Sequence, residues 1–426
     1  MKRLVLVSGV AGVLAAGTAL ANRPAGEATA AVALVVEGAV SATPWVAASG
    51  SFVTAVWGAS REGRADVYAA VSRDGGASFM APVRVNVVEG EARLGGELPP
   101  RVSLTPPRAG GTPGIAVLWT SRGTSTQVKL SRSDDGGQSF SAPVALQAAG
   151  AEGDRGWTSL TVDSRGAIHA AWLDHRGLAA AKPARGSAPS HGSGAHDGAA
   201  MAQRSGFYFA TAGEPERELS KGVCYCCKTA LAAGPDDMLV GAWRHVYRGN
   251  VRDIALTVSR NGGRTFSSPA RVSEDGWAIN GCPDDGPAVA VDGSGTIHVA
   301  WPTVIPGAEP EGAIFYTTSQ DGVTFKPRSR IPTETRRPAH PQIVVLGDGR
   351  VAVAWDERRD GASVASLRIV SRSPAGDPVI GPAVAISPDG AATYPVLAAT
   401  AKGVVAVWST GGASPAVWAR IIELPR

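Results

Sequence analysis

The chain has 426 residues, of which 44% are hydrophobic and 18% charged, and it contains 53 glycines and 30 prolines. This composition favours many short strands joined by tight turns and argues against a mainly helical protein. The formal net charge of +4 is spread over the whole length without a basic tract, which gives no support to a nucleic-acid-binding function.

The first predicted segment, residues 1–21, has the pattern of an export signal. Lys2 and Arg3 precede an apolar stretch from Leu4 to Leu20, and small residues at positions 19 and 21 suit a signal peptidase. We therefore expect cleavage near Ala21 and export to the periplasm or the extracellular space. The stretch is no longer than a membrane-spanning helix requires, and no stop-transfer charges follow it, so we expect no stable membrane anchor.

An apolar block that ends in tryptophan then recurs along the chain. Typical examples are Val53-Thr-Ala-Val-Trp57 and Ile297-His-Val-Ala-Trp301, and successive tryptophans are 53 to 71 residues apart. A regular repeat of this kind indicates a propeller or a solenoid. We predict an all-β propeller of four-stranded blades, about seven in number, with six as the alternative. The seven tryptophans are Trp57, Trp119, Trp172, Trp243, Trp301, Trp355 and Trp408.

The mature chain, residues 22–426, is predicted to form one domain. Its blades are expected to span roughly 40–90, 91–150, 151–221, 222–277, 278–333, 334–388 and 389–426. The last blade lacks an outer strand, and we expect residues 31–38 to supply it and so remove the open sheet edge. Residues 181–206, rich in alanine, glycine and serine, are predicted to be a flexible insertion in the third blade.

A turn rich in serine, aspartate and glycine precedes the outer strand of four blades. In the first blade it runs from Ser72 through Asp74 and Gly76 to Phe79. The aspartate side chain can bond backbone amides of its own turn, and glycine accepts a positive φ, so we assign these residues a structural role. This turn resembles the Asp-box of the sialidase/neuraminidase-like superfamily of BNR-repeat propellers. The residues concerned are Asp74, Asp135, Asn261 and Asp321.

The resemblance implies an active site with three arginines that grip a carboxylate and a tyrosine nucleophile. Tyr394 enters the last blade roughly where that nucleophile would lie. Arg336 or Arg337 can stand for one arginine of the triad, and Arg244, Arg248 or Arg252 for another. The family's first arginine lies in an Arg-Ile-Pro motif at the start of the first blade, where this chain has Thr43-Pro-Trp-Val-Ala47. We therefore expect a weak sialidase at best.

The loops that follow the tryptophan strands and those that lead into the inner strands are predicted to share one face of the propeller. Arginines and carboxylates gather in these loops, and convergent pairs of this kind indicate a site for an anionic ligand. The candidate ligand-binding residues are Arg244, Arg248, Arg252, Asp253, Arg336, Arg337 and Arg358.

All four cysteines belong to the same predicted face. Cys224, Cys226 and Cys227 form a Cys-x-Cys-Cys motif, which resembles that of a subgroup of bacterial BNR proteins. Cys282 precedes the inner strand of the next blade. Cys224 and Cys282 each lie 19 residues before their blade tryptophan, so we expect the cysteines to cluster. Disulfides are the default in an exported protein. A Cu(I) or Zn(II) site, helped by His245, and buried free thiols are the alternatives.

Two functional hypotheses follow from the sequence. The first is a non-catalytic exported propeller that binds a glycan, an anionic small ligand, a protein or a metal through the cysteine- and arginine-rich face. The alternative is an exo-sialidase or a related glycoside hydrolase that removes terminal sialic acid-type sugars.

Overall fold

The computed structural model describes residues 30–107, 111–179, 198–279, 281, 283–387 and 390–424. The predicted export signal, residues 1–21, and Cys282 lie outside this part of the chain. Across the described residues, no helix combines the length and the apolar character needed to cross a membrane.

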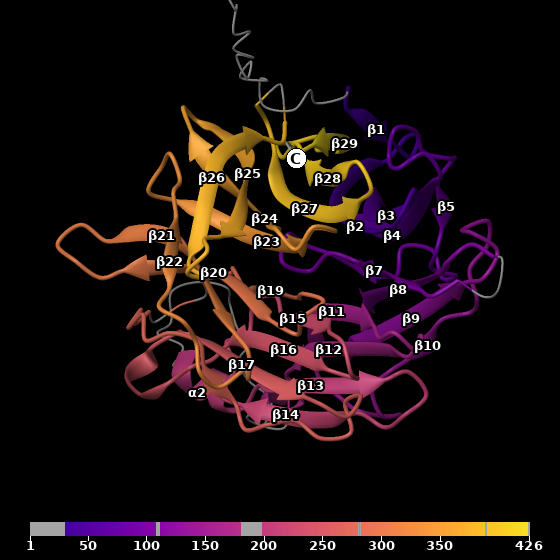
Figure 1. Ribbon diagram of the computed structural model, residues 1–426. Helices are drawn as coiled ribbons and strands as arrows, with labels where there is room; N and C mark the ends of the chain where they lie inside the picture. The colour runs from indigo at the N-terminus through magenta and orange to yellow at the C-terminus, as the bar shows by residue number, and fades with distance from the viewer. Residues whose placement is uncertain are drawn as a thin grey trace, which may run out of the picture.

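The described chain is nearly all β and consists of antiparallel sheets, most of them four-stranded, which confirms the predicted all-β class (Figure 1). The first half contains β1 (Val32–Leu34), β2 (Val40–Ser49), β3 (Phe52–Arg61), β4 (Arg64–Ser72), β5 (Val83–Arg84), β6 (Ala92–Arg93), β7 (Arg101–Thr105), β8 (Gly114–Ser121), β9 (Gln127–Ser133), β10 (Val144–Ala145), β11 (Arg155–Val162), β12 (Ile168–Asp174), β13 (Gly206–Thr211) and β14 (Arg217–Lys221).

The second half continues the same four-strand order. It contains β15 (Ala230–Ala233), β16 (Leu239–Arg244), β17 (Ile254–Ser259), β18 (Ala270–Arg271), β19 (Ala288–Val291), β20 (Ile297–Ile305), β21 (Glu311–Ser319), β22 (Ser329–Ile331), β23 (Pro338–Val345), β24 (Val351–Arg359), β25 (Ala362–Arg372), β26 (Pro378–Ala385), β27 (Thr393–Thr400), β28 (Gly403–Ser409) and β29 (Val417–Glu423).

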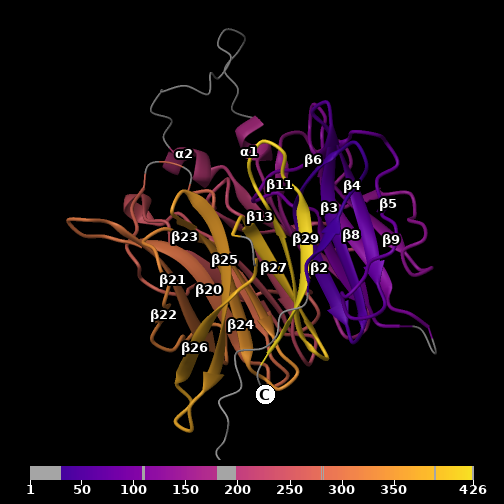
Figure 2. The ribbon, with the colours of Figure 1, turned by 90° about the horizontal axis from the view of Figure 1, so that it is seen from above.

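Within the described residues, short helices occur in two regions. The helices α1 (Arg176–Ala179) and α2 (Gly198–Gln203) flank residues 180–197, which lie outside the described part, and a 3₁₀ turn covers Arg248–Asn250. Both α2 and the start of β13 therefore fall inside the segment 181–206 that was expected to be a flexible insertion. Figure 2 shows α1 and α2 at one end of the strands and the C-terminus at the other end.

Two strand pairings link the sheets at their edges. The short strand β6 pairs with both β4 and β8, and this joins the first eight blade strands into one nine-stranded sheet. At the other end of the chain, β1 pairs with β29 in antiparallel register, with Val32 opposite Ala419 and Leu34 opposite Val417. The last sheet thus takes its fourth strand from the segment 31–38, and in Figure 1 the indigo β1 lies beside the yellow β29.

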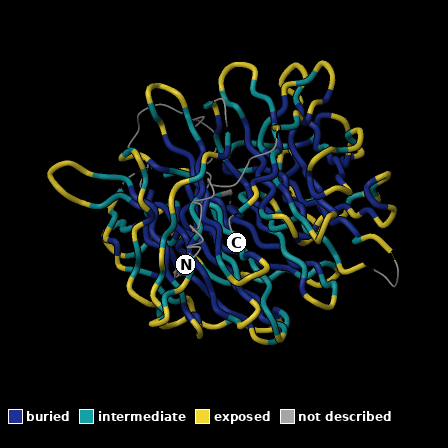
Figure 3. Tube along the Cα trace, turned by 45° about the horizontal axis from the view of Figure 1, so that its top comes forward, coloured by how far each residue is buried: buried dark blue, intermediate teal, exposed yellow. Residues whose placement is uncertain are grey.

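The hydrophobic core lies between neighbouring sheets. The seven repeat tryptophans are at most 2% exposed, because each lies on the second strand of its group, where apolar residues face both neighbours. Trp243 packs on Phe207 of the preceding sheet, and Trp57 shares a cluster with Val405 and Val417 of the last sheet. Buried strands therefore form the interior and exposed residues lie mainly in the connecting loops (Figure 3).

The serine- and aspartate-rich turns are held by their own side chains. The Asp135 carboxylate accepts hydrogen bonds from the backbone N–H groups of Gln138 (2.9 Å) and Ser139 (3.1 Å) and from the Ser133 hydroxyl (2.7 Å). Asp74 and Asp321 make equivalent contacts. Hydrogen bonds from Ser139 and Ser133 hold the pKa of Asp135 well below its usual range.

Asp135→Ala is expected to lower the free energy of unfolding by about 1–2 kcal/mol, because it leaves backbone N–H groups of the turn without their acceptor. Asp134→Ala is the matched control, since the side chain of this exposed neighbour makes no hydrogen bond within the described residues. Urea denaturation of both variants checks this. Equal stability of the two variants would show that the Asp135 contacts contribute nothing.

Candidate functional site

The innermost strand of every sheet contributes to a central channel. Its walls include residues from seven strands, β2, β7, β11, β15, β19, β23 and β27, which surround one axis in Figure 1. One representative from each strand, in chain order, is Trp45, Arg101, Ser159, Ala230, Ala288, Gln342 and Val396. At one end, the channel is continuous with a narrow pocket that shares Trp45, Lys228, Gln342 and Val396 with it. We call this the axial pocket.

A backbone irregularity places side chains at the axis. The pairing of the two innermost strands shifts register at the start of β2, β11, β23 and β27. The residues at these bulges are Thr43, Trp157, His340 and Tyr394, and all four have φ between 50° and 54°. A left-handed conformation is uncommon for such residues and is found where the surrounding structure enforces it, often at functional sites. The rings of His340 and Tyr394 contact each other, with centroids 3.9 Å apart.

Two carboxylates meet at one lysine beside the axial pocket. The Lys228 ammonium lies 3.3 Å from Oε1 of Glu97 and 3.8 Å from Oδ1 of Asp285. The backbone N–H of Lys228 donates to Oε2 of Glu97 at 2.8 Å, which fixes that carboxylate in orientation. All three residues are buried, and they come from loops that lead into β7, β15 and β19.

A second ion pair adjoins the first. Asp356, in β24, accepts a hydrogen bond from Nδ1 of His340 at 2.8 Å and from the backbone N–H of Tyr394 at 2.6 Å. The backbone N–H of His340 donates to Oδ2 of Asp285 at 3.0 Å. One ligand-type atom each from Glu97, Asp285 and His340 lies within 4.8 Å of the others. Five sheets thus converge on one cluster of charges.

The charged groups of this cluster shift one another's pKa values. Burial raises the pKa of Asp285 to about 6, although His340 and Lys228 act in the opposite direction. Burial alone would lower the pKa of His340, but the charges of Asp356, Asp285 and Glu97 raise it to about 9. Burial, followed by the charge of Glu97, raises the pKa of Tyr394 above its usual range. The phenol is therefore neutral, which does not favour Tyr394 as an activated nucleophile.

The stability contributed by His340 is expected to depend on pH. The pKa of His340 is raised on folding, from about 6.5 in the unfolded chain to about 9, so its contribution is complete below about pH 6.5 and is lost as the pH rises through 9. Chemical denaturation at a series of pH values checks this. The stability difference between the wild type and His340→Gln should shrink across that window, and a constant difference would contradict the assignment.

The predicted arginines on the ligand-binding face have other partners. Arg244 is 1% exposed and donates to the backbone carbonyls of Asp285 and Pro302, and Arg252 is fully buried and donates to Asn250 and to the Cys224 sulfur. These two side chains hold loops together. The exposed arginines do not converge: Arg336 pairs with Glu309, Arg358 donates to the Gly361 carbonyl of its own turn, and Arg248 and Arg337 lie at the surface.

The buried carboxylate of Asp253 is also internal. It pairs with Arg271 and accepts a hydrogen bond from the backbone N–H of Asp275 at 3.2 Å.

The structure instead brings Arg101 to the channel, a residue that sequence reasoning missed. Arg101 is 2% exposed, its guanidinium lies 3.7 Å from the ring centre of Trp45, and its Nε and Nη2 have no hydrogen-bond partner among the described residues. Burial lowers the pKa of Arg101 to about 9.

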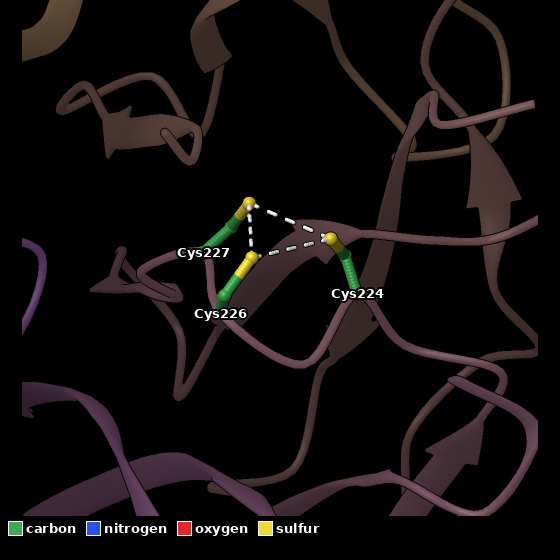
Figure 4. A group of neighbouring side chains, drawn as sticks. All are labelled: Cys224, Cys226 and Cys227. Carbon is green, nitrogen blue, oxygen red and sulfur yellow. Dashed lines mark hydrogen bonds between the residues drawn. The ribbon is translucent and has the colours of Figure 1, made fainter. Parts of the chain in front are cut away.

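The three cysteines of the Cys-x-Cys-Cys motif form a second buried cluster (Figure 4). Their sulfur atoms are 3.8 Å (Cys224 to Cys226), 4.0 Å (Cys226 to Cys227) and 3.7 Å (Cys227 to Cys224) apart. Cys224 and Cys227 are buried free thiols. A hydrogen bond from Cys227, with the nearby Arg252 and Arg244, lowers the pKa of Cys224 to about 6, and burial raises that of Cys227.

The other predicted members of this cluster are not placed in it. Cys282 lies outside the described residues, so its predicted proximity to Cys224 stays a prediction. The ring of His245 accepts a hydrogen bond from Nε1 of Trp243 at 3.4 Å and contacts Tyr247, and it does not belong to the group of potential metal ligands that the three cysteines form.

No protein-family model matches the chain. No curated protein matches it either. Solved structures do resemble it. A protein of unknown function from Dyadobacter fermentans DSM 18053 is 14% identical, with 94% of this chain and all of that chain covered and a TM-score of 0.53.

Two enzymes of known structure also resemble this chain. The GH93 α-L-arabinofuranosidase of Fusarium graminearum is 13% identical over 80% of this chain and 98% of its own, with a TM-score of 0.52. A PL25 ulvan lyase is 10% identical over 92% and 96%, with a TM-score of 0.56. At these identities the likeness establishes the fold alone, a propeller-like fold that occurs in glycosidases and polysaccharide lyases.

Proposed function

We propose that the protein hydrolyses a neutral glycan at the axial pocket. The observation that carries this proposal is the pair of carboxyl groups of Glu97 and Asp285, which have oxygen atoms within 4.8 Å of each other. Glycosidases that retain the anomeric configuration use two neighbouring carboxyl groups, one as acid and one as nucleophile. An α-L-arabinofuranosidase with the same fold supports this class of reaction.

The environments of the two carboxyl groups suit different roles. Asp285, whose pKa is raised by burial to about 6, keeps its proton up to about that pH and can give it to the glycosidic oxygen. Glu97, oriented by the backbone N–H and the ammonium of Lys228, attacks the anomeric carbon while the bond to the leaving group breaks. Water, deprotonated by Asp285, then breaks the bond between Glu97 and the sugar.

The charge of the pocket favours a neutral sugar over a sialic acid. The carboxyl groups of Glu97, Asp285 and Asp356 already pair with the cations of Lys228 and His340, so these two cations are not free to bind the carboxylate of a sialic acid. The arginines that a sialidase would direct at its substrate are engaged elsewhere, as Arg244 and Arg252 show. Trp45 and the neutral phenol of Tyr394 offer an aromatic surface and a hydrogen-bond donor for hydroxyl groups.

We further propose that the scaffold is a ring of seven blades closed by β1. Each pair of successive sheets shares a hydrophobic cluster, the first and last sheets share one too, and seven inner strands line one channel. The turns at Asp74, Asp135, Asn261 and Asp321 act as Asp-boxes in this account. Export, directed by residues 1–21, would place the protein where glycans are available as substrates.

Purified protein assayed on a panel of fluorogenic glycosides tests the activity. The panel contains neutral pentosides and hexosides, among them an α-L-arabinofuranoside, together with a sialoside. We expect turnover of at least one neutral glycoside at about 1 s⁻¹ or faster, a rate typical of enzymes, and none of the sialoside. Turnover of the sialoside alone, lost in Tyr394→Phe, would identify a sialidase and contradict the proposal.

A further inference from the structure

The central channel contains a buried cation that the proposed hydrolysis does not use. Arg101, in β7, is 2% exposed and lines the channel, but it does not line the axial pocket. Its Nε and Nη2 have no hydrogen-bond partner within the described part of the chain, and burial lowers its pKa. Buried polar groups in folded proteins are paired, and an unpaired buried charge is costly. Arg101 therefore indicates a site for a counterion.

The walls of the channel carry positive charge that no carboxylate on them matches. Among the described residues that line it, Arg101 and Lys228 are cations and none is an aspartate or a glutamate. Lys228 lies at the pocket end, where it pairs with Glu97 and Asp285. Glu97 acts electrostatically on Arg101, but both of its carboxylate oxygens contact Lys228. The charge of Arg101 is thus left for an anion in the channel.

The size of the channel and the presentation of Arg101 narrow the class of anion. The channel has a volume of about 190 Å³, many times the roughly 10–15 Å³ that one water needs. Because one guanidinium balances one negative charge, a phosphate dianion would keep an excess charge among walls such as Leu160 and Val289. A guanidinium holds two oxygens of a carboxylate with paired donors. Both such pairs include Nη2, which protein atoms cover. A spherical monovalent anion needs no paired donors.

We propose that the central channel binds one chloride ion at the guanidinium of Arg101. The ring of Trp45 covers the face of the guanidinium, 3.7 Å from its central carbon, so the ion approaches from the channel at the Nη1 end. Chloride offsets the buried charge at the axis, where the innermost strands of all seven sheets meet. The ion therefore stabilises the folded chain and takes no part in catalysis.

Urea denaturation in sodium chloride and in sodium gluconate of equal ionic strength tests this proposal. The pH is set about one unit below the pKa of Asp285, about 6, so that this carboxyl group at the pocket end is mostly neutral. Above its Kd, each tenfold increase in chloride should raise the folding constant of the wild type about tenfold, as one bound ion requires. Arg101→Met should lose this dependence. Arg330→Met should keep it, because Arg330 pairs with Glu311 at the surface.

Equal stability of the wild type in the two salts would mean that water alone fills the channel, and it would overturn the proposal. A chloride dependence that persists in folded Arg101→Met, with folding checked by circular dichroism, would do the same. Greater stabilisation by formate or phosphate than by chloride would overturn the assignment of the anion.

Bromide, an anomalous scatterer, locates the ion in crystals of the wild type. We expect one bromide in the channel, in contact with the Arg101 guanidinium. Bromide found only on the outer surface would show an adventitious ion only and would contradict the proposal. This measurement needs no variant, so it decides the matter even where Arg101→Met does not fold. None of these outcomes depends on glycan hydrolysis.

Discussion

Asp285→Asn is expected to lower kcat/KM on a glycoside with a poor leaving group by about 10²–10⁴-fold, the range that general acid–base catalysis contributes. The amide is close in shape to the acid but has no proton to give to the glycosidic oxygen. With a leaving group that needs no protonation, such as a dinitrophenolate, the rate of the step that forms the glycosyl-enzyme should fall much less. The raised pKa of Asp285, about 6, predicts that activity falls as the pH rises above that value.

Steady-state kinetics of the wild type and Asp285→Asn on both substrates measures this difference. Asp284→Asn is the matched control, because the Asp284 carboxyl group interacts electrostatically with Glu97, His340 and Lys228 but lacks the direct contacts of Asp285 with the Lys228 ammonium and the His340 backbone N–H. A loss of the same size on both leaving groups would mean that Asp285 does not act as the acid.

Lys228→Met is expected to lower the free energy of unfolding by about 3–5 kcal/mol, the cost of breaking a buried ion pair. The Lys228, Glu97 and Asp285 side chains are 4%, 2% and 11% exposed, so the two carboxylates would be left buried without their shared cation. Removing one of those charges as well should recover part of the loss. The double variant Lys228→Met/Glu97→Gln is therefore expected to be more stable than Lys228→Met alone.

Urea denaturation of the two single variants and the double variant forms a double-mutant cycle that isolates this coupling. Lys221→Met is the control, since the Lys221 side chain is 71% exposed and its pair with Glu218 should be worth no more than about 1 kcal/mol. A Lys228→Met variant no less stable than Lys221→Met would show that the axial ion cluster does not hold the inner loops together.

The strands could be predicted from the sequence because their signal is local. The block Val53–Trp57 lies in β3, and the block Ile297–Trp301 lies in β20. Burial of apolar residues on both faces of the second strand produces this signal. The partner of the last blade was also foreseeable, since residues 31–38 contain β1, which pairs with β29.

The axial pocket could not be predicted in the same way. Glu97, Lys228, Asp285 and His340 come from loops and strands of four different sheets, and no spacing in the sequence brings them together. One local signal was available: Thr43, His340 and Tyr394 share the left-handed bulge conformation, and each directly precedes a proline. Tyr394 was selected by resemblance and does line the pocket, but its pKa is raised by burial and then by carboxylates that lie far away in the sequence.

The predicted arginine site is a case in which the sequence suggested exposed side chains that the structure buries. Arg244 directly follows the buried strand block that ends at Trp243, and its side chain turns inward to backbone carbonyls. A sequence shows that a charged residue follows a strand, but whether its donors meet solvent or a carbonyl depends on the neighbouring sheet. Here Asp285 and Pro302, both from the following sheet, decide the outcome.

The central claim, that Glu97 is the nucleophile of a retaining glycosidase, is tested most directly by covalent trapping. The protein is incubated with the 2-deoxy-2-fluoro analogue of a glycoside that it cleaves, and the labelled peptide is identified by mass spectrometry. The account predicts one glycosyl adduct, on Glu97, and none in Glu97→Gln. An adduct on Tyr394, or inactivation-free turnover with inversion of the anomeric centre, would contradict it.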